Sequence, residues 1–270
     1  MITNISSFSS TFGIKNSTEL ADQLSRYAFP SNTVFDSFDI KDLFTSILIR
    51  ETHSHAEAVF SAGSPLSPPL AEIFLDNFEE KLFHSGNQLP HHILFWRRYV
   101  DDIICTSHSD FQLLNSFLVF LNSIHPSISF ALETSTNGTL NFLDLSISLV
   151  SGKLHFVIFH KPTYTNHAIP NFSSHHYSHK HALFHSLIHR LLHNPFSTQN
   201  FQKELNTIKY IAQINNYNPN LIHNLLNKKL KKLTSQNITP SLTPLKKEPT
   251  SWRTIPFHGP ISNAITNLFS

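Results

Sequence analysis

The residues best suited to chemistry in this chain are two adjacent carboxylates, Asp101 and Asp102, in the run Tyr99-Val100-Asp101-Asp102. Hydrophobic and basic residues precede the run and apolar residues follow it, a pattern typical of two short strands joined by a tight turn. Neighbouring carboxylates repel each other, and half-buried ones are costly unless a cation neutralises them. A divalent ion with oxygen ligands fits this need, and Mg²⁺ is the usual ion of phosphate chemistry. An ordinary polar turn is the alternative, because Asp also favours turns in its own right.

A third carboxylate, Asp39, ends the alternating apolar segment 33–40, which is predicted to be a strand. Asp at the junction of a strand and a helix is often a helix N-cap, and Asp42 is the better candidate for that role. One Asp at a strand end and two at a hairpin tip predict a three-carboxylate cradle for two metal ions. Such a pair of ions activates a 3′-hydroxyl and stabilises a leaving pyrophosphate.

Gly63, Ser64 and Pro65 lie between the two carboxylate motifs and open a Pro-rich segment that leads into an apolar helix at 70–78. Small residues and prolines favour a rigid loop that a base pair or a backbone can approach closely. Taken alone, the segment is better explained as a Pro-stiffened helix start.

The whole chain has 270 residues, of which 40% are hydrophobic and 14% charged, with a net charge of +2. This composition supports a real core and argues against disorder. The small positive excess means that any basic groove is a local feature. A single Cys, Cys105, excludes an intramolecular disulfide and indicates an intracellular protein, in nucleus or cytoplasm. No apolar run approaches membrane-spanning length, and the N-terminus lacks the layout of a signal peptide, so we expect no membrane association.

The elements that must position these residues form an α+β fold, with helices on one face of an antiparallel sheet. Helices are expected at 17–27, 70–78 and 111–124, and strands at 33–40, 93–105 (a hairpin), 128–132, 140–149 and 154–159. A change of composition at 160 introduces a His-rich segment, followed by helices near 182–193, 200–215 and 218–234. The predicted divisions are an N-terminal remnant at 1–32, a catalytic region at 33–165, a helical region at 166–234 and a Pro- and Ser-rich tail at 235–270.

In this order, strand-borne Asp39, the Gly-Ser-Pro-Leu-Ser-Pro loop and Tyr-Val-Asp-Asp resemble the palm motifs of a reverse transcriptase, and the details are closest to Penelope-like retroelements. Supporting segments are 140–145, 160–166 and the Ser-Ser-His-His-Tyr-Ser-His-Lys block at 173–180. The resemblance covers roughly residues 14–265. It implies a reverse-transcriptase-like palm followed by a helical thumb, and RNA-directed DNA polymerase activity. It also implies Mg²⁺ or Mn²⁺ as cofactor, with an RNA template, a DNA primer and deoxynucleoside triphosphates as partners.

By this resemblance, Asp39, Asp101 and Asp102 are the catalytic, metal-binding carboxylates. Tyr99 and Val100 would lie near the incoming nucleotide and the primer end.

The nucleic-acid-binding positions are also carried over from the resemblance. Gly63, Ser64 and Pro65 would contact template and nucleotide, and Lys161 would lie near the primer grip. Lys228 and Lys229 belong to a basic run that would hold phosphates on the thumb through charge. A solvated helix end is the alternative for that run.

The chain departs from the family pattern in two places. Only residues 48–62 separate the first carboxylate motif from Gly63, where relatives have several tens of residues more, so an internal deletion is expected there. The basic fingers strands have no visible counterpart before Asp39, and Lys15 and Arg26 are weak substitutes for a cationic clamp on the phosphates. We therefore expect a fragmentary element or an imperfect gene model, without the endonuclease of many relatives, and little or no polymerase activity from the isolated chain.

Three other functions are weighed against this one. A non-catalytic nucleic-acid-binding remnant would bind duplex in a salt-sensitive way and tolerate loss of Asp101 and Asp102. A triad hydrolase is disfavoured because no Gly-x-Ser-x-Gly elbow is present and Cys105 is expected on a buried strand. A zinc-binding protein would take its ligands from His175, His176, His179 and His181, with His53 and His55 as additions.

Overall fold

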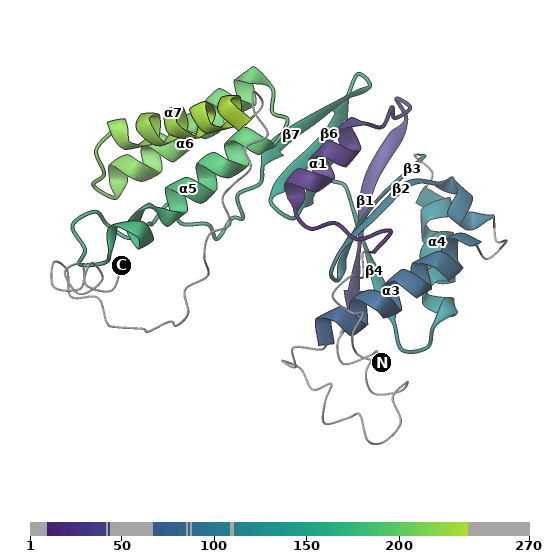
Figure 1. The fold of residues 1–270 in the computed structure, drawn as a ribbon. Coiled ribbons are helices and arrows are strands. Elements are labelled where there is room, and N and C mark those ends of the chain that lie inside the picture. Colours follow the sequence, from purple (N-terminus) through teal and green to yellow (C-terminus); the bar gives the residue numbers. More distant parts are fainter. Residues whose placement is uncertain are drawn as a thin grey trace, which may run out of the picture. The chain divides into compact units, whose positions relative to one another are not determined.

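The computed structural model describes residues 10–41, 43, 67–84, 86, 88–108 and 111–236. The chain divides into two compact units, Met1–His160 and Lys161–Ser270 (Figure 1). Several predictions lie outside the described residues: those on Asp42, on the short segment 48–62, on Gly63, Ser64 and Pro65, on His53 and His55, and on the tail from 237 onward.

The first unit is built on a four-stranded antiparallel sheet with the strand order β2-β3-β1-β4. β1 (Thr33–Lys41) pairs on one side with β3 (Asp102–His108) and on the other with β4 (Ser129–Thr134). β2 (Ile93–Tyr99) forms a hairpin with β3. The predicted strand ending near Asp39 and the predicted hairpin are thus neighbours, and the α+β class is confirmed.

Helices α3 (Ser67–His84) and α4 (Phe111–Ile124) cover one face of this sheet (Figure 1). Phe38 of β1 lies at the centre of the shared core, with ring centroids 5.8 Å from Trp96 and 5.9 Å from Phe117 of α4. Phe38 and Phe117 are each 1% exposed. Since burying a large apolar side chain contributes about 1.5–3 kcal/mol, this cluster fixes the helices on the sheet that carries the carboxylates.

Helix α1 (Ser17–Ser25) contacts the opposite face of the sheet, which differs from the prediction of helices on one face only. The side chain of Arg97 on β2 donates to Gln23 of α1 at 2.5 Å, and Arg97 points away from the face that holds Trp96. Beyond the helix, Phe29 packs edge-on against Phe35 of β1, with ring centroids 5.5 Å apart. The N-cap is Asn16, one residue before the predicted start.

A second sheet has the order β5-β6-β7, formed by Thr139–Phe142, Leu145–Val150 and Lys153–Ile158. The single strand predicted over 140–149 is wrong, because a two-residue turn at Leu143 and Asp144 folds it into a hairpin. Apolar residues alternate through the segment and hide the turn, which depends on a φ of +54° at Leu143. The turn predicted at 136–138 is present at Asn137 and Gly138, both with positive φ.

The second unit contains three helices, α5 (Tyr177–His193), α6 (Thr198–Ile214) and α7 (Asn220–Gln236). All three were predicted, but α5 begins five residues earlier because the His176 side chain caps it, accepting from the Ser178 amide. Their apolar faces share one core that includes Phe184, Ile208 and Ile222, each 0% exposed. None of the helices within the described part of the chain is long and apolar enough to cross a membrane.

Candidate functional site

Asp39 and Asp102 lie directly opposite each other on the central strand pair β1 and β3. The Ile40 amide donates to the Asp101 carbonyl at 3.0 Å, which makes Asp39 and Asp102 a non-hydrogen-bonded pair of the ladder. In such pairs the Cα atoms are about 4.5 Å apart and the side chains are at their closest. Two carboxylates, one half-buried and one exposed, therefore leave the same face of the sheet side by side.

The turn between β2 and β3 holds the third carboxylate, Asp101. Tyr99 pairs with Asp102, so Val100 and Asp101 are the two central residues of the hairpin. Val100 has a φ of +57° whereas Asp101 does not have a positive φ, which is the pattern of a type II′ turn. Glycine is the usual residue at the first position, and a β-branched residue there costs on the order of 1–3 kcal/mol. A strained turn thus presents Asp101 beside the carboxylate pair.

The structure brings Asp39, Tyr99, Val100, Asp101 and Asp102 to one edge of the sheet. Within the described residues, however, no three or more His, Cys, Asp or Glu side chains lie close enough together to hold a metal ion. Repulsion between neighbouring carboxylates favours rotamers that keep their oxygens apart. An Asp side chain reorients about two torsions, so a bridging divalent ion requires changes of rotamer but none of backbone.

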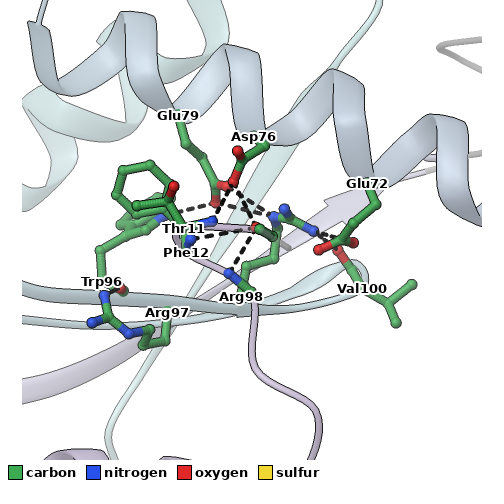
Figure 2. Close-up of polar contacts among 11 residues, drawn as sticks. Thr11, Phe12, Glu72, Asp76, Glu79, Trp96, Arg97, Arg98 and Val100 are labelled. Atoms are coloured by element: carbon green, nitrogen blue, oxygen red, sulfur yellow. Dashed lines mark hydrogen bonds and ion pairs between the residues drawn. The ribbon is translucent and has the colours of Figure 1, made fainter. Parts of the chain in front are cut away.

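The turn is held from behind by a buried charge network that sequence reasoning missed. Arg98, 0% exposed, donates through Nε to both carboxylate oxygens of Glu79 at 3.0 and 3.1 Å (Figure 2). Its Nη1 donates to Glu72 at 2.8 Å and to the carbonyl of Val100 at 3.4 Å. Trp96 Nε1 adds a bond to Glu79 at 2.9 Å. Arg98 therefore connects α3 directly to the backbone of the strained turn.

The same helix face also fixes the segment that precedes α1. Asp76, which follows Glu72 by one turn of α3, accepts from the Ser10 hydroxyl at 2.6 Å and from the Thr11 amide at 2.9 Å. The segment runs beside β2, since the Arg98 amide donates to the Phe12 carbonyl and the Ile14 amide donates to the Arg98 carbonyl. The spacing of Glu72, Asp76 and Glu79, which places three acidic residues on one face of the helix, is the sequence signal that could have revealed a buried cation.

Burial dominates the electrostatics of this network. It raises the pKa of Glu79 to about 7, although Arg98 and the Trp96 donor act in the opposite direction. For Arg98, the neighbouring Glu79 and Glu72 outweigh burial and raise the pKa above its ordinary value, so the guanidinium stays charged. The buried cation is thus paired with two carboxylates of different exposure through Nε and Nη1, while its buried Nη2 has no hydrogen-bond partner among the described residues.

The remaining predicted site residues belong to the second unit. Lys161 is exposed at the start of this unit. On α7, Lys228 is exposed and Lys229 is half-buried.

Among the candidate zinc ligands, His176 is the helix cap and the His175 ring forms a hydrogen bond with the Ser173 hydroxyl at 3.0 Å. Cys105 is fully buried on β3, as predicted, and burial raises its thiol pKa well above the ordinary value. A cysteine nucleophile is therefore disfavoured.

Charge is distributed unevenly between the two units, which the small net charge conceals. Met1–His160 carries 8 Lys and Arg against 16 Asp and Glu, whereas Lys161–Ser270 carries 12 against 2. A count by segment would have revealed this from the sequence. The basic excess of this protein therefore belongs to its second unit, Lys161–Ser270.

Comparison with known proteins gives three results. Residues 167–227 match the family model of the animal helix-turn-helix domain, and this range contains α5, α6 and the first part of α7. The search of curated proteins gives no match. Among solved structures, telomerase from Candida albicans, in complex with a TWJ fragment of telomeric RNA, is similar at 10% identity and a TM-score of 0.47. The match covers 83% of this chain and 46% of that one, and at this TM-score it supports no further conclusion.

Proposed function

We propose that Met1–His160 is the palm of a reverse-transcriptase-like nucleotidyltransferase, and that Lys161–Ser270 binds nucleic acid. The observation that carries the first part is the register of β1 and β3, which sets Asp39 opposite Asp102 and ties the Asp101 carbonyl to β1. Three carboxylates from two chain segments then share one edge, an arrangement that is costly unless it holds cations. The motif order that resembles Penelope-like elements agrees with this reading.

The donor set fits Mg²⁺ or Mn²⁺, because carboxylate oxygens are the ligands that these ions take in phosphate chemistry. Asp39, Asp101 and Asp102 would hold the metal, which when bound supplies an activated 3′-hydroxyl and charge compensation for the leaving pyrophosphate. Arg98 and α3 contribute a fixed turn, so that Asp101 keeps its position as charge changes at the site. Tyr99 lies opposite Asp102 and would border the space taken by nucleotide and primer end.

A second candidate function is nucleic-acid binding without catalysis, and the basic charge of the second unit favours it. Nine Lys and Arg stand against one acidic residue in the described range 161–236. Phosphate backbones are recognised through such an excess, and helix-turn-helix domains are a common means of docking a helix on duplex. The two functions differ in one respect: the first requires the carboxylates of Asp39, Asp101 and Asp102, and the second does not.

Metal binding tests the palm directly. Mn²⁺ titrated into the full chain and followed by electron paramagnetic resonance should show bound ion in the wild type and loss of that binding in the Asp39→Asn/Asp102→Asn variant. Glu80→Gln/Glu133→Gln removes two exposed carboxylates elsewhere in the same unit and should leave binding unchanged. Equal Mn²⁺ binding by wild type and the Asp39/Asp102 variant would contradict the metal site.

Primer extension separates the two functions. On an RNA template with a DNA primer, deoxynucleotides and Mg²⁺ or Mn²⁺, we expect little or no extension, because no cationic clamp on the triphosphate is assigned. Efficient extension that Asp101→Asn abolishes would overturn this expectation and strengthen the assignment of the site. Duplex binding that is unaffected by Asp101→Asn, combined with no metal binding, would favour the non-catalytic function.

A further inference from the structure

A ridge of imidazoles runs along α5 and has no part in the proposed catalytic site. His181, His185, His189 and His193 recur at every fourth position, so they line one inclined row of the helix surface. The last three are exposed and His181 is half-buried. None of the four belongs to the apolar core of the unit, which uses the Phe184, Leu187, Ile188 and Leu191 side of α5.

Lysines from α7 extend this ridge into a broader surface. Lys229 Nζ donates to the carbonyl of His185 at 2.6 Å, which brings the two helices together at the middle of the ridge. The charge of Lys229 also acts on His189, and the charge of Lys228 acts on His185. Lys232 is near enough to act on Lys229. We call the set His181, His185, His189, His193, Lys228, Lys229 and Lys232 the His–Lys surface.

The charged groups around this surface are almost all basic. Every charge that acts on His185 or His189 comes from Lys228, Lys229 or another ridge His. The helix α6, which also packs on α5, carries Lys203, Glu204 and Lys209. Glu204 is the sole acidic residue in the described part of this unit. Burial and the charge of Glu204 raise the pKa of the Tyr164 hydroxyl, and the charge of Arg190 lowers it.

The rings at the end of the ridge lie face to face. His189 and His193 stack with centroids 3.9 Å apart and planes 7° from parallel. His193 Nδ1 lies 2.8 Å from the carbonyl of His189, an acceptor, so Nδ1 carries a hydrogen and Nε2 is the ring nitrogen left for a ligand. Two stacked imidazolium rings repel each other unless an anion lies beside them.

We propose that the His–Lys surface binds the phosphate backbone of a nucleic acid and takes up protons as it binds, so that affinity rises as the pH falls. The proposal rests on the proposed nucleic-acid-binding function of this unit and specifies its surface and its control. Burial, first, and the neighbouring lysines lower the pKa of His185, and burial with His193 and Lys229 lowers that of His189, so both rings are largely neutral at pH 7 without a ligand. A phosphate beside the rings supplies the opposite charge and favours the protonated form.

The salt dependence of binding gives the proposal a quantitative test. Each phosphate neutralised on duplex DNA adds about 0.9 to the negative slope of log K against log salt. If His185 and His189 become phosphate contacts on protonation, that slope should steepen by roughly 1–2 between pH 8 and pH 5.5.

The experiment measures binding of the full chain to a fluorescent 20-base-pair DNA duplex by anisotropy, at pH 8, 7, 6 and 5.5 and at several salt concentrations. In the His185→Gln/His189→Gln/His193→Gln variant, the steepening of the slope at low pH should largely disappear. The matched control is His91→Gln/His92→Gln/His108→Gln, which removes three exposed imidazoles from the first unit and should behave as wild type. Calorimetry in two buffers of different ionisation enthalpy should show proton uptake only where the ridge is intact.

The outcomes distinguish the role of the His–Lys surface from the more general proposal that Lys161–Ser270 binds nucleic acid. Binding at pH 8 with a slope that is independent of pH, or equal pH dependence in the ridge variant, overturns the role of the ridge and leaves nucleic-acid binding standing. Absence of duplex binding at every pH overturns both. Ridge-dependent binding to vesicles of 30% anionic lipid that exceeds duplex binding at equal salt also overturns the proposal, because the partner would then be a membrane surface.

Discussion

Val100 is the residue where backbone conformation and residue type conflict most clearly. Its φ of +57° suits glycine, yet a β-branched side chain, 41% exposed, stands there. By contrast, the turn between β6 and β7 places Ser151 and Gly152 at its two positive-φ positions. Leu143 at the β5–β6 turn also has a positive φ, +54°, but of these turn residues Val100 alone is β-branched, and it precedes the two Asp.

Val100→Gly should stabilise the protein. Relief of about 1–3 kcal/mol of strain outweighs the extra entropy of glycine in the unfolded chain, about 0.5–1 kcal/mol, and the exposed side chain loses little packing. We expect a gain on the order of 1 kcal/mol in urea unfolding. Val150→Gly, next to the β6–β7 turn and also exposed, is the matched control and should lose stability. Equal losses in both variants would show that Val100 is not strained.

Asp39→Asn should also stabilise the chain when divalent ions are chelated. The substitution removes a like charge opposite Asp102, a gain of about 0.2–1 kcal/mol. In Mg²⁺ or Mn²⁺ the order of stability of the two proteins should reverse if the proposed site binds metal, because only the wild type would then gain stability by mass action. Thermal unfolding with chelator and with metal gives both values. Glu133→Gln, on β4 opposite Ser37, should show neither effect.

At the scale of elements, β2, α3 and the segment before α1 meet at Arg98 and depend on one another. Burial of a cation with two carboxylates is weak support for stability by itself, but removal of one partner strands a buried charge at a cost of about 3–5 kcal/mol. Arg98 on β2 bonds both to Glu72 and Glu79 of α3 and to the Val100 carbonyl in the turn (Figure 2). A shift of α3 relative to β2 would therefore also disturb the turn.

The pH dependence of unfolding should reveal Glu79. Its folded-state pKa is raised from 4.5 to about 7, so the folded chain holds a proton that the unfolded chain releases between these values. The stability from this group is complete below pH 4.5 and is lost as the pH rises through 7. Glu79→Gln should not show this loss of stability between pH 5 and pH 8. The free energy of unfolding of the variant, relative to that of the wild type, should therefore rise by on the order of 1–3 kcal/mol over this range. The exposed Glu80→Gln on the same helix should follow the wild type, and parallel profiles for Glu79→Gln and wild type would contradict the shift.

Local pattern predicted most of these elements. The spacing of apolar residues gave α4 at its observed bounds, and strand alternation gave β1 and the β2–β3 hairpin. The failures have physical causes: the β5–β6 turn depends on a backbone conformation at Leu143 that side-chain type does not signal, and Arg98 is buried because of carboxylates 19 and 26 residues away. The sequence predicted that Asp39 and Asp102 lie close together, but not that they pair directly across two strands. The register between distant strands is set by the whole sheet.

At the scale of the whole molecule, a net charge of +2 separates into an acidic first unit and a basic second one. An acidic unit does not attract a polyanion, so its carboxylates need cations before a nucleic acid can approach them. The basic unit supplies attraction that needs no metal. Under the proposed function, the charge of the second unit would hold nucleic acid, and the carboxylates of the first unit would act only with bound cations.

Charge removal in matched sets tests this division of roles. Lys228→Gln/Lys231→Gln/Lys232→Gln removes three exposed cations from α7 and should weaken binding to duplexes of any sequence, because phosphates carry no sequence information. The slope of log K against log salt should fall in magnitude by up to about 2.7, at 0.9 per lost contact. Lys15→Gln/Lys81→Gln/Lys153→Gln removes three exposed lysines from the first unit and should change the slope by less than one contact. Equal losses from the two sets would mean that attraction to nucleic acid is spread over the whole surface, and that the basic unit has no special role in binding.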